Sequence, residues 1–118
     1  MQCVRFDPGK GRQITQFGSQ FTHVRLAKTS TEAHVSAIYL GPSGVVGWHQ
    51  AATRQLLLVV NGTGWVRTGE DKIFVGEGMA ILWESGEWHE TGTDTELIAI
   101  VIESDGLDLS QWIKVPNA

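Results

Sequence analysis

The sequence predicts an all-β fold in a single domain, and three observations lead to this prediction. Apolar residues occur in short runs, such as LLLVV and LIAIVI, whose lengths suit strands. Turn-forming residues separate these runs at regular intervals, and 14 of the 118 residues are glycine. No segment before the tail has the spacing of an amphipathic helix. Such a pattern is typical of an antiparallel sandwich or barrel.

The first expected strand is His34 to Leu40, which ends at a Gly-Pro-Ser-Gly turn. The second is Gln55 to Val60, followed directly by Asn61-Gly62. Because Asn-Gly between apolar runs is a strong hairpin signal, we expect a tight turn there and a return strand over Trp65 to Thr68.

The remaining elements continue the same pattern. Glycine and other turn formers separate three further expected strands, which are Lys72 to Val75, Met79 to Trp83 and Leu97 to Glu103. Only the tail, near Leu107 to Ile113, has a pattern that suits a helical turn or two.

Composition excludes several classes of protein. With 12.9 kDa and a formal charge of −4, residues 1–118 make one domain without a basic cluster, so we expect no nucleic-acid partner. The apolar runs are far shorter than the roughly 18 residues of a membrane helix, so we expect no membrane partner either. The first ten residues lack a signal-peptide core, and Cys3 is the one cysteine. Both features favour a location in the cytoplasm.

The runs LLLVV and LIAIVI are apolar at successive positions, which implies that both faces of these strands are covered. In a chain this small, we expect a second copy to supply the outer cover, which predicts a homodimer. The N-terminal strands are the competing cover.

Two histidines are placed to converge inside such a barrel. His49, Ala51 and Gln55 have the same parity on an extended strand, so their side chains lie on one face. His89 follows the Ser85-Gly86 turn, near the start of a later strand. We therefore expect a polar patch of His49, Gln55 and His89 in an otherwise apolar interior, as in small-molecule pockets.

This arrangement resembles the cupin family over about residues 35–103. The spacing of the first cupin motif falls on His49, Ala51, Gln55 and Gly62, and that of the second on Gly78, Glu84, Gly86, His89 and Thr93. The resemblance implies a double-stranded β-helix, or jelly roll, with a pocket at the barrel mouth and usually a dimer. It implies no particular reaction, because the fold supports many activities.

In cupins the matching motif residues hold a divalent metal through three histidines and one glutamate. Here Ala51 cannot coordinate, and Gln55 offers an amide oxygen in place of a carboxylate. His49, Gln55 and His89 would therefore hold Fe, Mn, Zn or Ni only weakly. Glu84, Glu87 and Glu90 surround His89, and parity makes Glu87 the best placed to complete the site.

The sequence leaves several functions open. The first hypothesis is a barrel that binds a small organic molecule; its candidate ligand-binding residues are His49, Gln55, His89, Trp48, Trp83 and Glu87. The second is a metal-dependent oxidoreductase or isomerase that uses His49, Gln55 and His89.

Two further readings remain. One is metal-free acid–base catalysis by His89 beside Glu87 or Glu90. In the other, both motif histidines are ordinary polar side chains that form hydrogen bonds inside the barrel and bind no ligand. His23 and His34 match neither motif and are expected at the surface.

Overall fold

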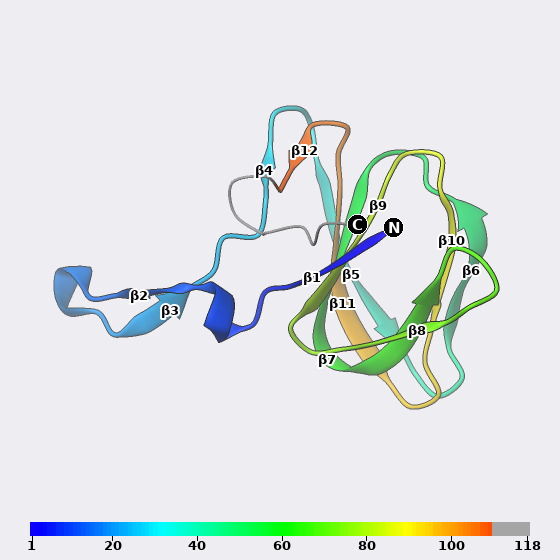
Figure 1. Ribbon diagram of the computed structural model, residues 1–118, viewed down its shortest axis with the longest axis horizontal. Coiled ribbons are helices and arrows are strands. Elements are labelled where there is room, and N and C mark those ends of the chain that lie inside the picture. The colour runs from blue at the N-terminus through cyan, green and yellow to red at the C-terminus, as the bar shows by residue number, and fades with distance from the viewer. Residues whose placement is uncertain (110–118) are drawn as a thin grey trace.

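The computed structural model describes residues 1–109, and these are mostly extended, as expected (Figure 1). Two short 3-10 turns, Pro8–Lys10 and Gln16–Gly18, lie near the N-terminus. The strands are β1 (Gln2–Arg5), β2 (Arg12–Ile14), β3 (Phe21–His23), β4 (Lys28–Thr29), β5 (His34–Leu40), β6 (Val45–Gln50), β7 (Gln55–Arg67), β8 (Ile73–Gly76), β9 (Met79–Trp83), β10 (Trp88–Gly92), β11 (Leu97–Glu103) and β12 (Leu107–Asp108).

The barrel is organised around β7, which belongs to both of its layers. The first part of β7 pairs antiparallel with β9 and β11, and β1 and β5 extend this layer at its two ends. The second part of β7 pairs with β8 and β10, and β6 pairs with β10. One long strand therefore passes from one layer to the other and holds them together.

The predicted hairpin at Asn61-Gly62 is wrong, because β7 runs without interruption from Gln55 to Arg67. Gly62 has a φ of +83°, and a Cβ atom there would lie 2.1 Å from the carbonyl oxygen of Glu96. The register against β11 also shifts between Ile98 and Ala99. Such a bulge increases the local twist and bends the strand. The Asn-Gly pair thus redirects the chain between layers instead of reversing it.

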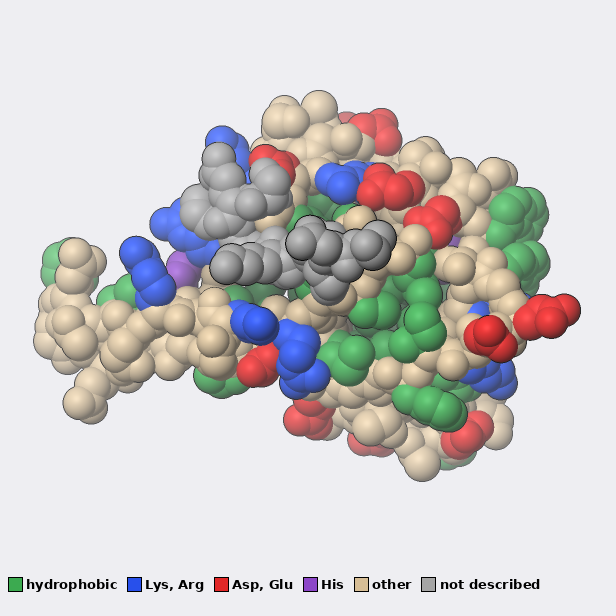
Figure 2. Space-filling view, viewed as in Figure 1, with side chains coloured by type: hydrophobic (Ala, Val, Ile, Leu, Met, Phe, Trp, Pro, Cys, Tyr) green, Lys and Arg blue, Asp and Glu red, His purple; other side chains and the backbone are tan. Residues whose placement is uncertain are grey.

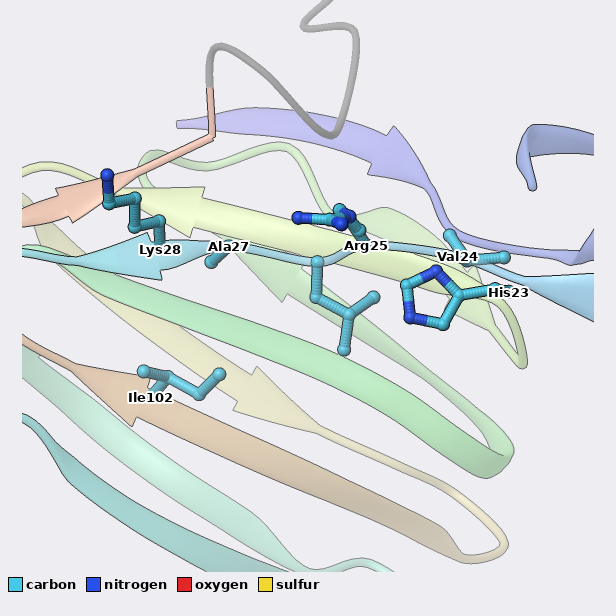
Figure 3. A pocket seen from close by; sticks show the side chains of 7 residues that line it. His23, Val24, Arg25, Ala27, Lys28 and Ile102 are labelled. Carbon is cyan, nitrogen blue, oxygen red and sulfur yellow. The ribbon is translucent and has the colours of Figure 1, made fainter. Parts of the chain in front are cut away.

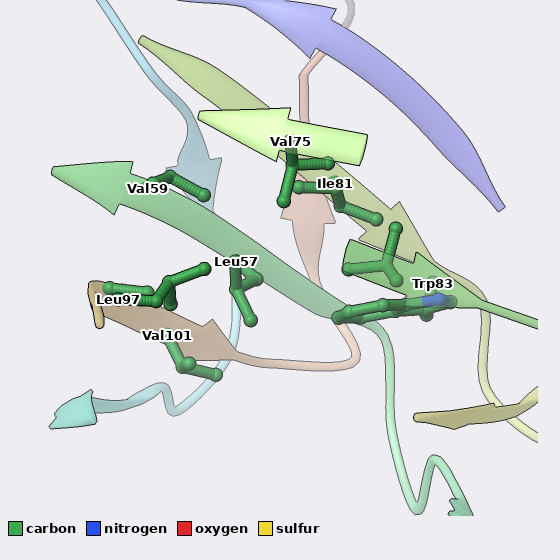
Figure 4. Packing of buried hydrophobic residues seen from close by; sticks show 9 residues of the cluster. Leu57, Val59, Val75, Ile81, Trp83, Leu97 and Val101 are labelled. Carbon is green, nitrogen blue, oxygen red and sulfur yellow. The ribbon is translucent and has the colours of Figure 1, made fainter. Parts of the chain in front are cut away.

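Side chains of β7 alternate between two apolar clusters on opposite faces. Leu57 and Val59 point into the barrel, where the interior cluster also includes Val75, Ile81, Trp83 and Val101 (Figure 4). Leu56 and Leu58 point outward into a second cluster. All four β7 side chains are at least 97% buried. Burying each contributes about 1.5–3 kcal/mol, which makes this segment the centre of the fold.

The N-terminal segment supplies much of the outer cover. β1 pairs with β9, and Val4 of β1 belongs to the outer cluster. Phe6 and Leu26 pack against the same cluster, and Leu107 joins it from β12. The N-terminal segment, which was the alternative to a second copy, therefore covers the outer face of these strands.

A hairpin of β2 and β3 projects away from the barrel (Figure 1). Phe17 at its tip is fully exposed and has a φ of +61°. Near its base, the segment His23–Lys28 and Ile102 line a groove of about 650 Å³ (Figure 3). Lys and Arg side chains gather around this base, whereas acidic side chains are spread over the barrel (Figure 2).

The tail differs from the expected helical turn where it is described. Leu107 and Asp108 form β12, which pairs with Thr29 and Lys28 of β4. Leu109 follows without regular secondary structure, and residues 110–113 of the segment expected to be helical lie outside the described residues. In residues 1–109, no helix is long and apolar enough to span a membrane.

Candidate functional site

The two motif histidines lie side by side at one end of the barrel. His49 on β6 is directly opposite His89 on β10, and their ring centroids are 4.4 Å apart. His89 is 2% exposed, whereas His49 is exposed at the rim. The structure thus brings together the two imidazoles that the sequence spacing paired, one inside and one at the mouth.

Both imidazoles use Nδ1 to contact the backbone carbonyl two residues earlier in the chain. Nδ1 of His49 lies 2.7 Å from the carbonyl oxygen of Gly47, and Nδ1 of His89 lies 3.3 Å from that of Glu87. A carbonyl oxygen only accepts hydrogen bonds, so each Nδ1 carries a proton. In the neutral rings, each Nε2 is consequently left as a hydrogen-bond acceptor.

A second row of polar side chains lies at the same end of the other layer. The row contains four cross-strand neighbours, which are His34 on β5, Glu103 on β11, Gln55 on β7 and Trp83 on β9. Nε2 of Gln55 donates a hydrogen bond of 2.6 Å to Glu103. The two layers meet where the Trp83 ring stacks on His89, with centroids 4.3 Å apart. Gln55, Trp83 and both motif histidines therefore belong to one polar end of the barrel.

Trp83 carries an unsatisfied hydrogen-bond donor. Its side chain is fully buried, and its Nε1 has no hydrogen-bond partner in the part of the chain that the structure describes. In Figure 4 this nitrogen points away from Leu57 and Val101. A buried N–H without a partner costs about 1–3 kcal/mol, so native proteins usually satisfy it with a protein group, a water or a ligand.

The pKa of His89 is lower than that of an ordinary histidine. Burial is the main cause, because it disfavours the charged ring. The hydrogen bond to the Glu87 carbonyl raises the pKa, and the charge of His49 lowers it. The charges of Glu87 and Glu103 also raise the pKa, by less. The net lowering of the pKa keeps His89 neutral at pH 7, with its Nε2 as an acceptor.

Glu87, which the sequence suggested as an additional ligand, directs its carboxylate elsewhere. Oε2 lies 2.6 Å from the N-terminal ammonium group of Met1, and Oε1 accepts a hydrogen bond from the backbone N–H of Glu84. Burial raises the pKa of Glu87, but these two contacts lower it by more, so its pKa is below the usual value. The carboxylate is thus ionised and already paired.

The neighbouring acidic residues are paired as well. Glu84 accepts two hydrogen bonds from the guanidinium group of Arg54. Glu90 forms an ion pair of 2.7 Å with Arg67. Neither carboxylate is therefore a free base beside His89.

Two of the three tryptophans near the motifs lie on the outer surface. Trp48 and Trp88 are 41% and 48% exposed, and their rings stack with centroids 6.1 Å apart. Arg67 lies over the Trp48 ring at 4.5 Å. Trp48 precedes His49 on β6, and Trp88 precedes His89 on β10. Because side chains alternate along a strand, the two tryptophans lie on the opposite face of the layer from the histidines.

Glu103 is the site residue that the sequence interpretation missed. It lies at the end of β11 and has the parity of Leu97, Ala99 and Val101, which all point into the barrel. The alternation in LIAIVIE could have identified it. The cupin motifs do not include this position.

Glu103 also lines a surface hollow of about 280 Å³ at this end of the barrel. The other residues that line the hollow are Thr31, Glu32, His34, Thr53, Ser104 and Asp105. The carboxylate thus lies between the solvent and the interior polar end, as its partly buried side chain also indicates. His34 is strongly exposed there, as expected for a surface histidine.

The residues present do not fit a cupin metal centre. Ala51 is buried at the second motif position and offers no donor atom. The amide nitrogen of Gln55 is turned to Glu103. Among residues 1–109, no three His, Cys, Asp or Glu side chains are placed to hold a metal ion. Two imidazoles and one amide oxygen form a weak donor set for Fe, Mn, Zn or Ni.

The chain is similar in fold to several solved cupins. A cupin superfamily protein from Desulfitobacterium hafniense superposes with a TM-score of 0.58 at 12% identity, covering 66% of this chain and 74% of that one. A cupin-like protein from Thermotoga maritima superposes with a TM-score of 0.59 at 21% identity, covering 67% of each chain. A predicted oxalate decarboxylase from the same organism superposes with a TM-score of 0.52 at 19% identity, covering 63% of this chain and 64% of that one. The comparison with curated proteins gave no match.

These likenesses confirm the jelly-roll fold expected from the sequence. In the comparison with protein families, residues 32–102 match the AraC-like ligand binding domain, which is more than half of the chain. The matched segment runs from just before β5 to Ile102, one residue before the end of β11, and includes both motif histidines. The chain therefore belongs to the family of AraC-like ligand binding domains and has the fold of the cupins.

Proposed function

We propose that this protein binds a small organic molecule at the polar end of its barrel. The ligand contacts are His49, Gln55, His89, Trp83 and Glu103. The observation that supports this most directly is the buried, unpartnered Nε1 of Trp83 beside two imidazoles whose Nε2 atoms are acceptors. A ligand that reaches this point would satisfy a donor that the described protein leaves unpaired.

The surroundings of these groups suit binding more than catalysis. Glu84, Glu87 and Glu90, the acidic side chains that the sequence placed around His89, each already have a hydrogen-bonded or ionic partner. The name of the matched family also describes ligand binding. We therefore place the binding hypothesis before the metal-dependent and acid–base alternatives.

A thermal-shift screen of small polar molecules tests the proposal. A ligand at 100 times its Kd adds about 2.7 kcal/mol to the free energy of unfolding. We expect hits whose affinity falls about threefold to tenfold in W83F, because this change removes the N–H and keeps an aromatic ring. In W88F, the matched change on the outer face, affinity should stay as in the wild type. Hits unaffected by W83F and by His49→Ala would contradict the proposed site.

A homodimer also remains a proposal, and the projecting hairpin now supports it. Phe17 is fully exposed and Phe21 is 48% exposed, although a two-stranded hairpin by itself has marginal stability in water. Residues 1–31 contain five of the nine Lys and Arg residues and one of the thirteen acidic residues. The basic N-terminal segment of one copy therefore complements the acidic barrel of a second copy.

We also propose the cytoplasm as the location of the protein. Cys3 is a free, partly buried thiol, and burial raises its pKa. A cysteine that remains unpaired suits a reducing compartment. Fractionation of cells that make the full chain, followed by detection with an antibody, would check this location.

A further inference from the structure

The polar end of the barrel offers more hydrogen-bond acceptors than donors. The acceptors are Nε2 of His49, Nε2 of His89, Oε1 of Gln55 and the carboxylate of Glu103. One of the two N–H groups of the Gln55 amide is bound to Glu103, and Nε1 of Trp83 is a donor without a partner among residues 1–109. A complementary ligand must therefore bring several donors and one acceptor.

The charge at this end is negative. Glu103 is partly buried, and its hydrogen bond comes from the neutral amide of Gln55. A neutral donor leaves the charge of a carboxylate uncompensated, and burial makes that costly. A cationic group on the ligand would supply the missing charge.

The adjoining hollow has the same electrostatic character. Three carboxylates, those of Glu32, Glu103 and Asp105, contribute to its described lining, which contains no Lys or Arg side chain. Such a lining concentrates cations near the surface and repels anions. Glu103 belongs both to the lining of the hollow and to the interior polar row, so its carboxylate is shared by the two.

We propose that the ligand is a small organic ammonium compound with an oxygen atom next to its amine, and that Glu103 binds the ammonium group. This inference rests on the proposed function. The ammonium protons go to Glu103 and to the imidazole Nε2 acceptors, and the oxygen accepts the Trp83 N–H. No covalent step is involved.

The other ligand classes fit less well. A neutral polyol could satisfy the acceptors, but the charge of Glu103 would stay uncompensated. An organic anion would face Glu103 and the carboxylates of the hollow. The charge of the ligand is therefore the property to vary in the experiment.

Three compounds with one three-carbon skeleton isolate the charge: 1-amino-2-propanol, 1,2-propanediol and lactate. Each is titrated into the full chain at pH 8, where histidines are neutral and the amine is protonated. Binding is followed by the indole N–H signals in NMR spectra, with that of Trp83 assigned from its loss in W83F. We expect the amine to shift the Trp83 signal with at least about tenfold higher affinity than the diol. Lactate should leave the signal unchanged.

Two charge-matched variants test the role of Glu103. In E103Q we expect the preference for the amine over the diol to fall below about threefold. In E70Q, which removes a charge from the exposed turn before β8, the preference should be retained. The comparison of the three compounds on the wild-type chain remains decisive if E103Q unfolds.

The outcomes separate this inference from the proposed function. If the diol or lactate binds as well as the amine, the site binds small molecules but the inference about the ammonium group is wrong. An equal preference in E103Q and wild type would assign the selectivity to another group and overturn the role of Glu103. If none of the three shifts the Trp83 signal, the ammonium inference is wrong. If the wider screen also fails, the proposed function is wrong too.

Discussion

At the scale of single residues, the polar end is defined by which atom each side chain leaves free. His49 and His89 both use Nδ1 on a backbone carbonyl, so the tautomer of the neutral ring is set by the local backbone. Trp83 is stacked on His89, and its N–H has no partner in residues 1–109. The polar end thus combines acceptors of fixed position with a donor that the described residues leave unpaired.

The lowered pKa of His89 predicts a pH-dependent stability. Below the pKa of a histidine in the unfolded chain, about 6.5, the unfolded state binds more protons than the native state. The free energy of unfolding should therefore decrease as the pH falls from 7 towards 5. We expect urea titrations to show a smaller decrease in H89Q than in wild type. The same decrease in H23A as in wild type would serve as the control.

The donor set predicts little bound metal. Protein purified without chelator should contain far less than one metal ion per chain, because Ala51 and Gln55 replace two metal ligands of the cupin motif. Inductively coupled plasma mass spectrometry measures this directly. A near-stoichiometric metal that disappears in both H49A and H89A would place the metal-dependent alternative before the binding hypothesis.

At the scale of elements, β7 links the two layers, and its buried side chains determine its stability. We expect Leu57→Ala to lower the free energy of unfolding by about 2–5 kcal/mol, because it removes a side chain from the interior cluster. Val60→Ala, on the same strand at a 46% exposed position, should cost about 0.5 kcal/mol or less. Urea denaturation of both variants measures the difference. Similar costs would mean that the interior of β7 is not the centre of the fold.

How far the sequence predicts these elements depends on whether the signal is local. The strands β5, β9 and β11 have local signals, namely alternation and flanking turn formers, and they lie close to where these signals place them. At Asn61-Gly62 the local signal indicates a hairpin, but the tertiary environment decides otherwise, because Gly62 packs directly against the backbone of Glu96. A close approach between distant segments leaves no trace in a short window of sequence.

The same distinction applies to the site. The spacing of the motif positions is enough to predict that His49 and His89 lie together. The parity argument is wrong for Gln55, because β6 ends at Gln50 and Gln55 begins β7 in the other layer. The pairing of Gln55 with Glu103 depends on the register between β7 and β11, which the sequence pattern does not specify. The outward position of Trp48 follows parity, and the expectation that it lines the pocket gave too much weight to its closeness to His49.

At the scale of the whole molecule, the projecting hairpin gives the proposed homodimer a specific test. We expect the double variant F17S and F21S to weaken self-association by about tenfold or more, because it removes two exposed aromatic side chains from the proposed contact. Light scattering after size-exclusion chromatography measures the mass as a function of concentration.

Phe74 provides the control for this test, since it is 78% exposed on β8, away from the hairpin. F74S should leave the mass unchanged. A wild-type protein that stays at the monomer mass at all concentrations would contradict the homodimer. So would a double variant that associates as strongly as the wild type.

The antiparallel pairing also has a consequence for the speed of folding. Gln2 pairs with Leu82, and His34 pairs with Glu103, so strands far apart in the sequence must meet before either layer is complete. Proteins with so many non-local pairings fold in milliseconds to seconds, because long loops must close before contacts compensate for the lost entropy. The last strands of the barrel, β10 and β11, complete both rows of the polar end. A nascent chain therefore cannot assemble the polar end of the barrel until almost all of residues 1–109 have been synthesised.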